Sequence, residues 1–68
     1  MPDTQTKFRA RLNEIIKLYP NMNTCAVGLG ISISHLSRMK TGLSEPSLST
    51  LDTIAKASSV SIGWLVGE

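Results

Sequence analysis

A short run near the middle of the chain, between residues 26 and 39, limits the possible folds more than any other feature. Its defining positions are Ala26, Gly30, Ile31, Ser32, Leu36 and Met39. Ala26 lies four residues before Gly30, which places both on one face of a helix that ends near residue 29. Gly30 can adopt the left-handed conformation that follows a helix, and Ser32 can cap a new helix with its side-chain oxygen. The run therefore predicts two short helices that cross at a small residue and are joined by a tight turn.

Two helices joined in this way form a helix-turn-helix, a unit that commonly lays its second helix in the major groove of DNA. The charge distribution is compatible with that ligand. Residues 1–40 carry six of the seven basic residues against two acidic ones, whereas residues 41–68 carry one basic residue against three acidic ones. A basic half suits a polyanion, although an ordinary solvated surface also carries such charges. Charge alone leaves the ligand open, and the motif favours DNA.

The rest of the chain predicts short helices around one core, because 68 residues leave no room for a second domain. The predicted helices run from about Thr4 to Leu18, from Asn21 or Asn23 to Leu29, from Ser32 to Lys40 or Thr41, from Ser47 to just past Ala57, and from Ser61 to Val66. No alternation of useful length predicts a strand. The predicted fold class is all-α, a compact bundle of about five short helices.

The helical spacing of the apolar residues also predicts the core. One buried cluster is expected to contain Phe8, Leu12, Ile16, Ala26, Ile31, Leu36, Leu51, Ile54 and Leu65. On the first helix, Arg9 and Arg11 fall on the opposite, polar face. Cys25 is expected to be a small buried hydrophobe.

The residue types present argue against an enzyme and against a metal site. His35 is the only histidine and Cys25 the only cysteine, which leaves almost no material for a metal site, a catalytic triad or a disulfide. The serines fall at caps and turns. We therefore predict no enzymatic activity, no metal and no cofactor. No apolar run approaches the roughly 18 residues of a membrane span, and no secretory signal is present, so we predict no membrane association and a cytoplasmic location.

The chain from about residue 8 to residue 67 resembles the DNA-binding domain of phage repressors and related bacterial regulators of the lambda-repressor, Cro and XRE type. The matching residues include Ala26, Gly30-Ile31-Ser32, Leu36, Met39, Gly42, Pro46-Ser47-Leu48, Leu51, Ile54-Ala55-Lys56-Ala57, Val60-Ser61, Trp64-Leu65 and Gly67. The resemblance implies a transcriptional regulator in the bacterial cytoplasm, associated with the nucleoid. Within the family, the chain most resembles a phage or prophage repressor. It also implies a homodimer on a pseudo-palindromic double-stranded DNA operator.

By this resemblance, the third predicted helix reads bases with Ile33, Ser34 and Arg38, and with Ser37 as a secondary position. The chemistry suits these roles. Arg38 can form two hydrogen bonds with guanine, Ile33 can pack on the methyl group of thymine, and Ser34 can bond to almost any base. The residues that follow, Lys40, Thr41 and Ser44, are expected to contact the sugar-phosphate backbone.

Two positions depart from the family pattern. Family members often have glutamine at the first position of the second helix, where it binds a phosphate, and this chain has Met22. Cys25 stands where the family usually has leucine. Methionine cannot donate a hydrogen bond, so the backbone amides at this helix start, or the side chains of Asn21 and Asn23, are expected to hold the phosphate instead.

Two other functions stay open at the level of sequence. The same fold serves as an antitoxin or another protein-binding module, in which case Trp64 is a candidate partner contact. The chain could also bind nucleic acid without sequence preference, against which the modest net charge of +2 argues. Residues 1–68 are expected to form a single domain, either alone or as the N-terminal part of a longer repressor with a peptidase or oligomerisation domain after Glu68.

Overall fold

The computed structural model describes residues 4–67, and this part of the chain forms five helices. They are α1 (Thr4–Ile16), α2 (Met22–Leu29), α3 (Ile33–Thr41), α4 (Leu48–Ser58) and α5 (Ile62–Leu65). Within residues 4–67 there is no strand, and none of the helices is long and apolar enough to cross a membrane. The prediction of an all-α bundle of about five short helices is confirmed.

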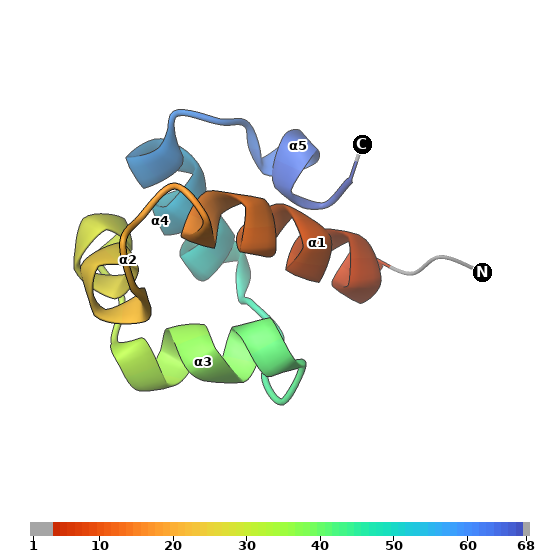
Figure 1. The fold of residues 1–68 in the computed structure, drawn as a ribbon. Helices are drawn as coiled ribbons and strands as arrows, with labels where there is room; N and C mark the ends of the chain where they lie inside the picture. The colour runs from red at the N-terminus through yellow and green to blue at the C-terminus, as the bar shows by residue number, and fades with distance from the viewer. Residues whose placement is uncertain (1–3, 68) are drawn as a thin grey trace.

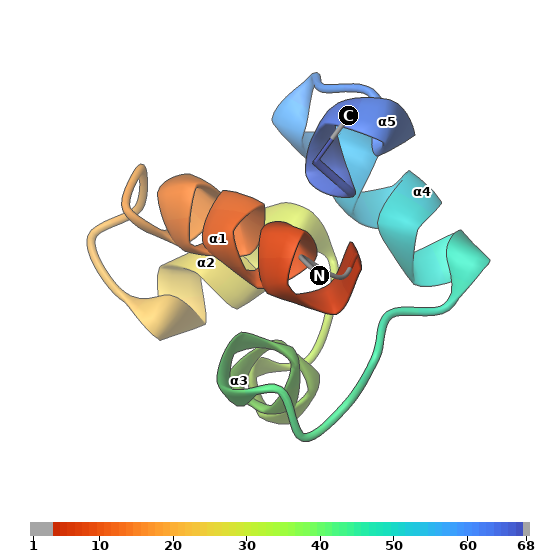
Figure 2. The same ribbon diagram turned by 90° about the vertical axis from the view of Figure 1, so that its right-hand side faces the viewer.

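Helix α1 runs through the middle of the molecule, with α3 on one side of it and α5 on the other (Figure 1). Helix α2 packs against α3 and α4, and α4 packs against α5. In the view along α3, the other helices all lie to one side of it (Figure 2). One long side of α3 is therefore left without a helix against it.

The core is a single cluster to which all five helices contribute. Its buried members are Phe8, Leu12, Ile15, Cys25, Ala26, Leu29, Leu36, Met39, Ile54, Ala55 and Leu65. Six of the nine predicted core residues are among them, while Ile16, Ile31 and Leu51 are only partly buried against the cluster. Cys25 is buried as expected, and its burial raises the pKa of the thiol.

Side-chain caps define where four of the helices begin. Asn21, Ser32, Ser47 and Ser61 each have an extended backbone, and each accepts a hydrogen bond from the amide three residues later. The sequence left Asn21 and Asn23 as alternative caps of α2, and the structure assigns the cap to Asn21. Gly30 has a φ of 75°, which confirms the predicted left-handed turn between α2 and α3.

The cap at Ser32 should stabilise α3 measurably. Its Oγ accepts from the amide of His35 at 3.1 Å, and an alanine would leave that amide without this partner. We expect Ser32→Ala to lower the free energy of unfolding by about 1 kcal/mol in urea denaturation. Ser37→Ala, an exposed substitution within the same helix, should change it by less than about 0.5 kcal/mol. Equal stabilities of the two variants would contradict the capping role.

One helix end differs from the sequence-based expectation, and one helix end is confirmed. Helix α1 ends at Ile16 rather than near Leu18, because the chain tightens into turns in which the amides of Leu18 and Tyr19 donate three residues back. Helix α4 ends at Ser58, and Ser59 takes the left-handed conformation with a φ of 57°. This end lies just past Ala57, as predicted, but the left-handed conformation of Ser59 was not predicted, because serine rarely adopts it.

Candidate nucleic-acid interface

The side of α3 that faces away from the bundle presents the four predicted base-reading residues together. Ile33, Ser34, Ser37 and Arg38 are all exposed and line one shallow, open depression. The opposite side of the same helix carries Leu36 and Met39, which have no exposed surface. The spacing of three and four residues along α3 thus separates an apolar side that holds the helix in place from a polar side that is free to bind.

The two cations of α3 are not neutralised within the described residues. The Arg38 and Lys40 side chains are exposed, and neither forms an ion pair with any residue from 4 to 67. By contrast, Lys56 pairs with Asp52 at 3.0 Å on α4, and Arg11 pairs with Glu14 at 3.3 Å on α1. Two unpaired positive charges therefore lie on the helix whose outer side is uncovered.

The C-terminal end of α3 is closed by backbone hydrogen bonds around Gly42, whose φ is 86°. The amides of Leu43 and Ser44 both donate to the carbonyl of Arg38, at 2.9 and 3.3 Å. The Thr41 hydroxyl lies 3.1 Å from the carbonyl of Ser37 and donates to it. Of the three predicted backbone-binding residues here, Lys40 and Thr41 are exposed and Ser44 is half-buried, and Thr41 would have to release its internal hydrogen bond to donate to a phosphate.

The start of α2 holds the other predicted phosphate contacts. The side-chain oxygen of Asn21 accepts from the amide and the hydroxyl of Thr24, at 2.8 and 3.0 Å, which leaves the side-chain nitrogen as its donor. The side chain of Met22 packs against the core, so only its backbone amide could bind an anion. Asn23 is exposed. The first-turn amides of Met22 and Asn23 have no acceptor within the helix, as is general for a helix N-terminus.

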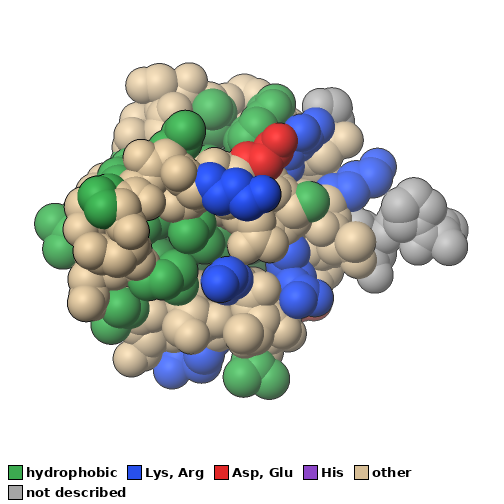
Figure 3. Space-filling model, viewed as in Figure 1, with side chains coloured by type: hydrophobic (Ala, Val, Ile, Leu, Met, Phe, Trp, Pro, Cys, Tyr) green, Lys and Arg blue, Asp and Glu red, His purple; other side chains and the backbone are tan. Residues whose placement is uncertain are grey.

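Basic side chains gather on the face that contains α1 and α3. Figure 3 shows Lys and Arg side chains over α1, between α1 and α3 and along the outer edge below α3, whereas apolar side chains gather over α2. A face of this charge can attract a polyanion at long range.

Sequence analysis placed Arg9 and Arg11 on the polar face of the first helix, and the structure adds a long-range contact for each of them. The Arg11 guanidinium stacks over the ring of Trp64, 4.7 Å from its centroid, and its Nε donates to the Trp64 carbonyl at 3.2 Å. Trp64 is thereby held partly buried against the core. Arg9 is exposed, but its Nε donates to the carbonyl of Lys40 at 3.1 Å. Both contacts join residues far apart in the sequence, so no local pattern could have revealed them.

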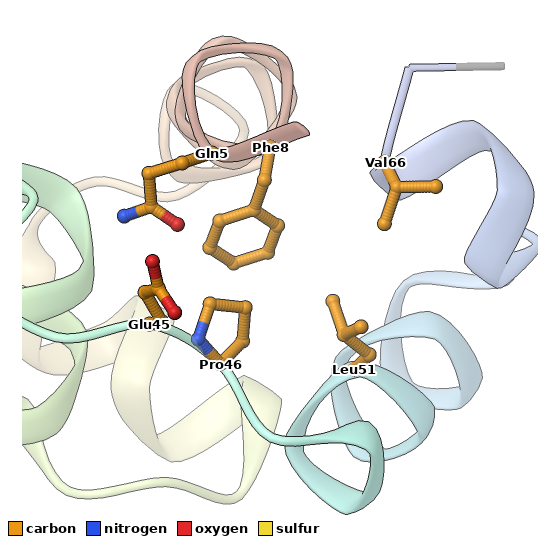
Figure 4. A pocket seen from close by; sticks show the side chains of 6 residues that line it. All are labelled: Gln5, Phe8, Glu45, Pro46, Leu51 and Val66. Carbon is orange, nitrogen blue, oxygen red and sulfur yellow. The ribbon is translucent and has the colours of Figure 1, made fainter. Parts of the chain in front are cut away.

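A cavity of about 170 Å³ lies between α1, the loop before α4, and the two C-terminal helices. Its lining is mostly apolar, with Phe8, Pro46, Leu51 and Val66, while the polar ends of Gln5 and Glu45 face each other at one side (Figure 4). Among the described residues no cluster of histidine, cysteine and carboxylate side chains could hold a metal ion. The cavity therefore offers a small apolar space and no set of catalytic groups.

Comparison with known protein families identifies the family of the chain. A family model described as helix-turn-helix matches residues 26–65, more than half of the chain, from the buried Ala26 of α2 to the end of α5. No curated protein and no solved structure matches the chain. The chain belongs to the helix-turn-helix family of the lambda-repressor, Cro and XRE type, whose members are DNA-binding domains of the transcription-regulator kind.

Proposed function

We propose that this chain binds double-stranded DNA in a sequence-specific manner and regulates transcription, as a phage or prophage repressor. The observation that carries the proposal is the outer side of α3, where Ile33, Ser34, Ser37 and Arg38 are exposed together while Leu36 and Met39 anchor the helix in the core. An α-helix fits into the major groove of B-form DNA, where each base pair presents a distinct pattern of donors and acceptors.

Within the groove, the four side chains would divide the work by their chemistry. The planar guanidinium of Arg38 can donate two parallel hydrogen bonds to O6 and N7 of a guanine. Ile33 offers apolar contact to a thymine methyl group, and the hydroxyls of Ser34 and Ser37 can bond to a base or a phosphate. Bound in this way across a promoter, the protein would repress by excluding the polymerase.

The positioning contacts would come from both ends of the motif. One phosphate would be bound by the amides at the start of α2 together with Asn21 and Asn23. The sugar-phosphate backbone of the DNA beyond the end of α3 would be contacted by Lys40, Thr41 and Ser44. We further propose that two copies bind a pseudo-palindromic operator, with half-sites about one helical turn apart. Sedimentation of the protein with and without DNA would test the dimer.

Selection of binding sites from a random pool of duplexes tests the proposal as a whole. Enrichment of one sequence, with a preference for it over a scrambled duplex of at least about 10³-fold, is the result expected for specific binding. Equal affinity for both duplexes would instead indicate a nucleic-acid binder without sequence preference.

A separate prediction concerns the backbone contacts. Lys40→Ala should weaken binding to the selected and the scrambled duplex alike, because a phosphate contact carries no sequence information. It should also lower the salt dependence of binding, measured as the slope of log binding constant against log salt concentration, by about one unit. A loss confined to the selected duplex would place Lys40 on a base instead.

An antitoxin-like, protein-binding role is the second proposal, and exposed apolar residues favour it. Leu18, in the turn after α1, and Val27, on α2, are 80% and 81% exposed. Isolated apolar side chains are common on protein surfaces, so this observation carries less than the α3 surface does. Trp64 is a weaker candidate for the partner contact, since it packs under Arg11.

A further inference from the structure

Arg9 is a side chain of α1 that reaches the end of α3. Its Nε donates to the carbonyl of Lys40 at 3.1 Å, across 31 positions of sequence. The guanidinium also lies against Gly42, since a Cβ built on that glycine would be 3.1 Å from Nη1 and 3.3 Å from Cζ of Arg9. Gly42 therefore serves two purposes, because it takes the left-handed conformation that ends α3 and leaves space for the guanidinium beside it.

Arg9 lies against the C-terminal end of α3, and without Arg9 this helix end would be electrostatically unfavourable for DNA. The last carbonyls of an α-helix lack partners within the helix and carry partial negative charge. At the end of α3, the carbonyls of Arg38 and Met39 accept backbone amides from the turn, and the carbonyl of Lys40 accepts from Arg9. A full positive charge thus lies against a helix end that would otherwise repel a phosphate.

The contact with Lys40 uses only part of the guanidinium. Arginine has five N–H donors, and the bond from Nε leaves the four on Nη1 and Nη2. The residue is exposed and forms no ion pair with any residue from 4 to 67. These outer donors are arranged as a fork that fits a phosphate.

From this geometry we infer that Arg9 is a DNA-backbone contact supplied by α1, which binds a phosphate while it holds the last turn of α3. The inference rests on the proposed function and adds to it a residue outside the helix-turn-helix. Arg9 would be a direct contact to the ligand, joined through Lys40 and Gly42 to the helix that reads bases.

The salt dependence of binding separates a phosphate contact from a merely structural cap. We expect Arg9→Gln to lower the slope of log binding constant against log salt by about one unit, on a selected and on a scrambled duplex alike. At 0.1 M salt this corresponds to an affinity loss of about eightfold to tenfold, which should vanish on extrapolation to 1 M. Lys56→Gln is the matched control, because it also removes one positive charge. Lys56 lies on α4, where it forms an ion pair with Asp52, so its loss should leave the slope unchanged.

Arg9→Lys provides a second variant that keeps the charge and removes the fork, and circular dichroism would show whether each variant folds. The lysine variant should keep the slope of the wild-type protein, even where the glutamine variant does not fold. An unchanged slope for folded Arg9→Gln, or a reduced slope for Arg9→Lys, would overturn the inference. A wild-type protein that prefers no duplex sequence would overturn the proposed specificity instead, and the scrambled duplex would still report on Arg9.

Discussion

Replacing Ala26 with leucine should lower the free energy of unfolding by about 1–3 kcal/mol. Ala26 is 3% exposed and belongs to the core cluster at the point where α2 packs against α3. Core side chains are close-packed, so three added carbon atoms can be accommodated only by displacing a neighbouring side chain or by moving the helices apart. Either response would also move α3, whose position depends on this crossing.

The adjacent residue gives a matched control for this experiment. Val27 lies on the same helix but is 81% exposed, and Val27→Leu adds a carbon atom where nothing opposes it. Its stability should stay within about 0.5 kcal/mol of the wild-type value in the same urea titration. If Ala26→Leu unfolds at the same urea concentration as Val27→Leu, the crossing of α2 and α3 is not as tightly packed as its burial implies.

Much of the fold could be predicted because its signals are local. A side-chain cap bonds to an amide three residues later, and a left-handed glycine acts within one turn, so Ser32, Ser47 and Gly30 mark helix ends without knowledge of the tertiary structure. The left-handed conformation of Ser59 after α4 lacked such a signal, because serine rarely adopts it. The cluster also admits Ile15 and leaves Ile16 half-buried, which depends on how α1 is rotated against its neighbours.

The candidate site follows the same division. The outer side of α3 could be predicted because Leu36 and Met39 fix which residues of one short helix face inward. The roles of Arg9 and Arg11 could not, since each depends on a carbonyl that only the folded chain brings near, in Lys40 and in Trp64. From the sequence of an amphipathic helix alone, a long flexible side chain on its polar face is predicted to be solvated. Its contacts can be assigned only when the positions of the neighbouring helices are known.

Arg38→Ala is expected to reduce affinity for the selected duplex by about 1–3 kcal/mol and to relax the preference at one or two base pairs. Among the outward residues of α3 that line its depression, Arg38 is the one with a long, charged donor side chain. Its guanidinium can distinguish guanine from the other bases, because the two acceptors on the major-groove edge of guanine match two of its donors. The measurement is a titration of the selected duplex and of variants with single base-pair changes.

Two comparisons make the Arg38 experiment decisive. Ile33→Ala removes only apolar contact and should weaken the preference for a thymine, while the preference for guanine stays. Arg38→Ala should reduce the affinity of the protein for the scrambled duplex far less than its affinity for the selected duplex. The reason is that a base contact contributes little to non-specific binding. If both duplexes lose the same affinity, Arg38 binds a phosphate. Base discrimination by α3 would then have to come from Ile33, Ser34 and Ser37. Their side chains are shorter than that of arginine and extend less far from the helix.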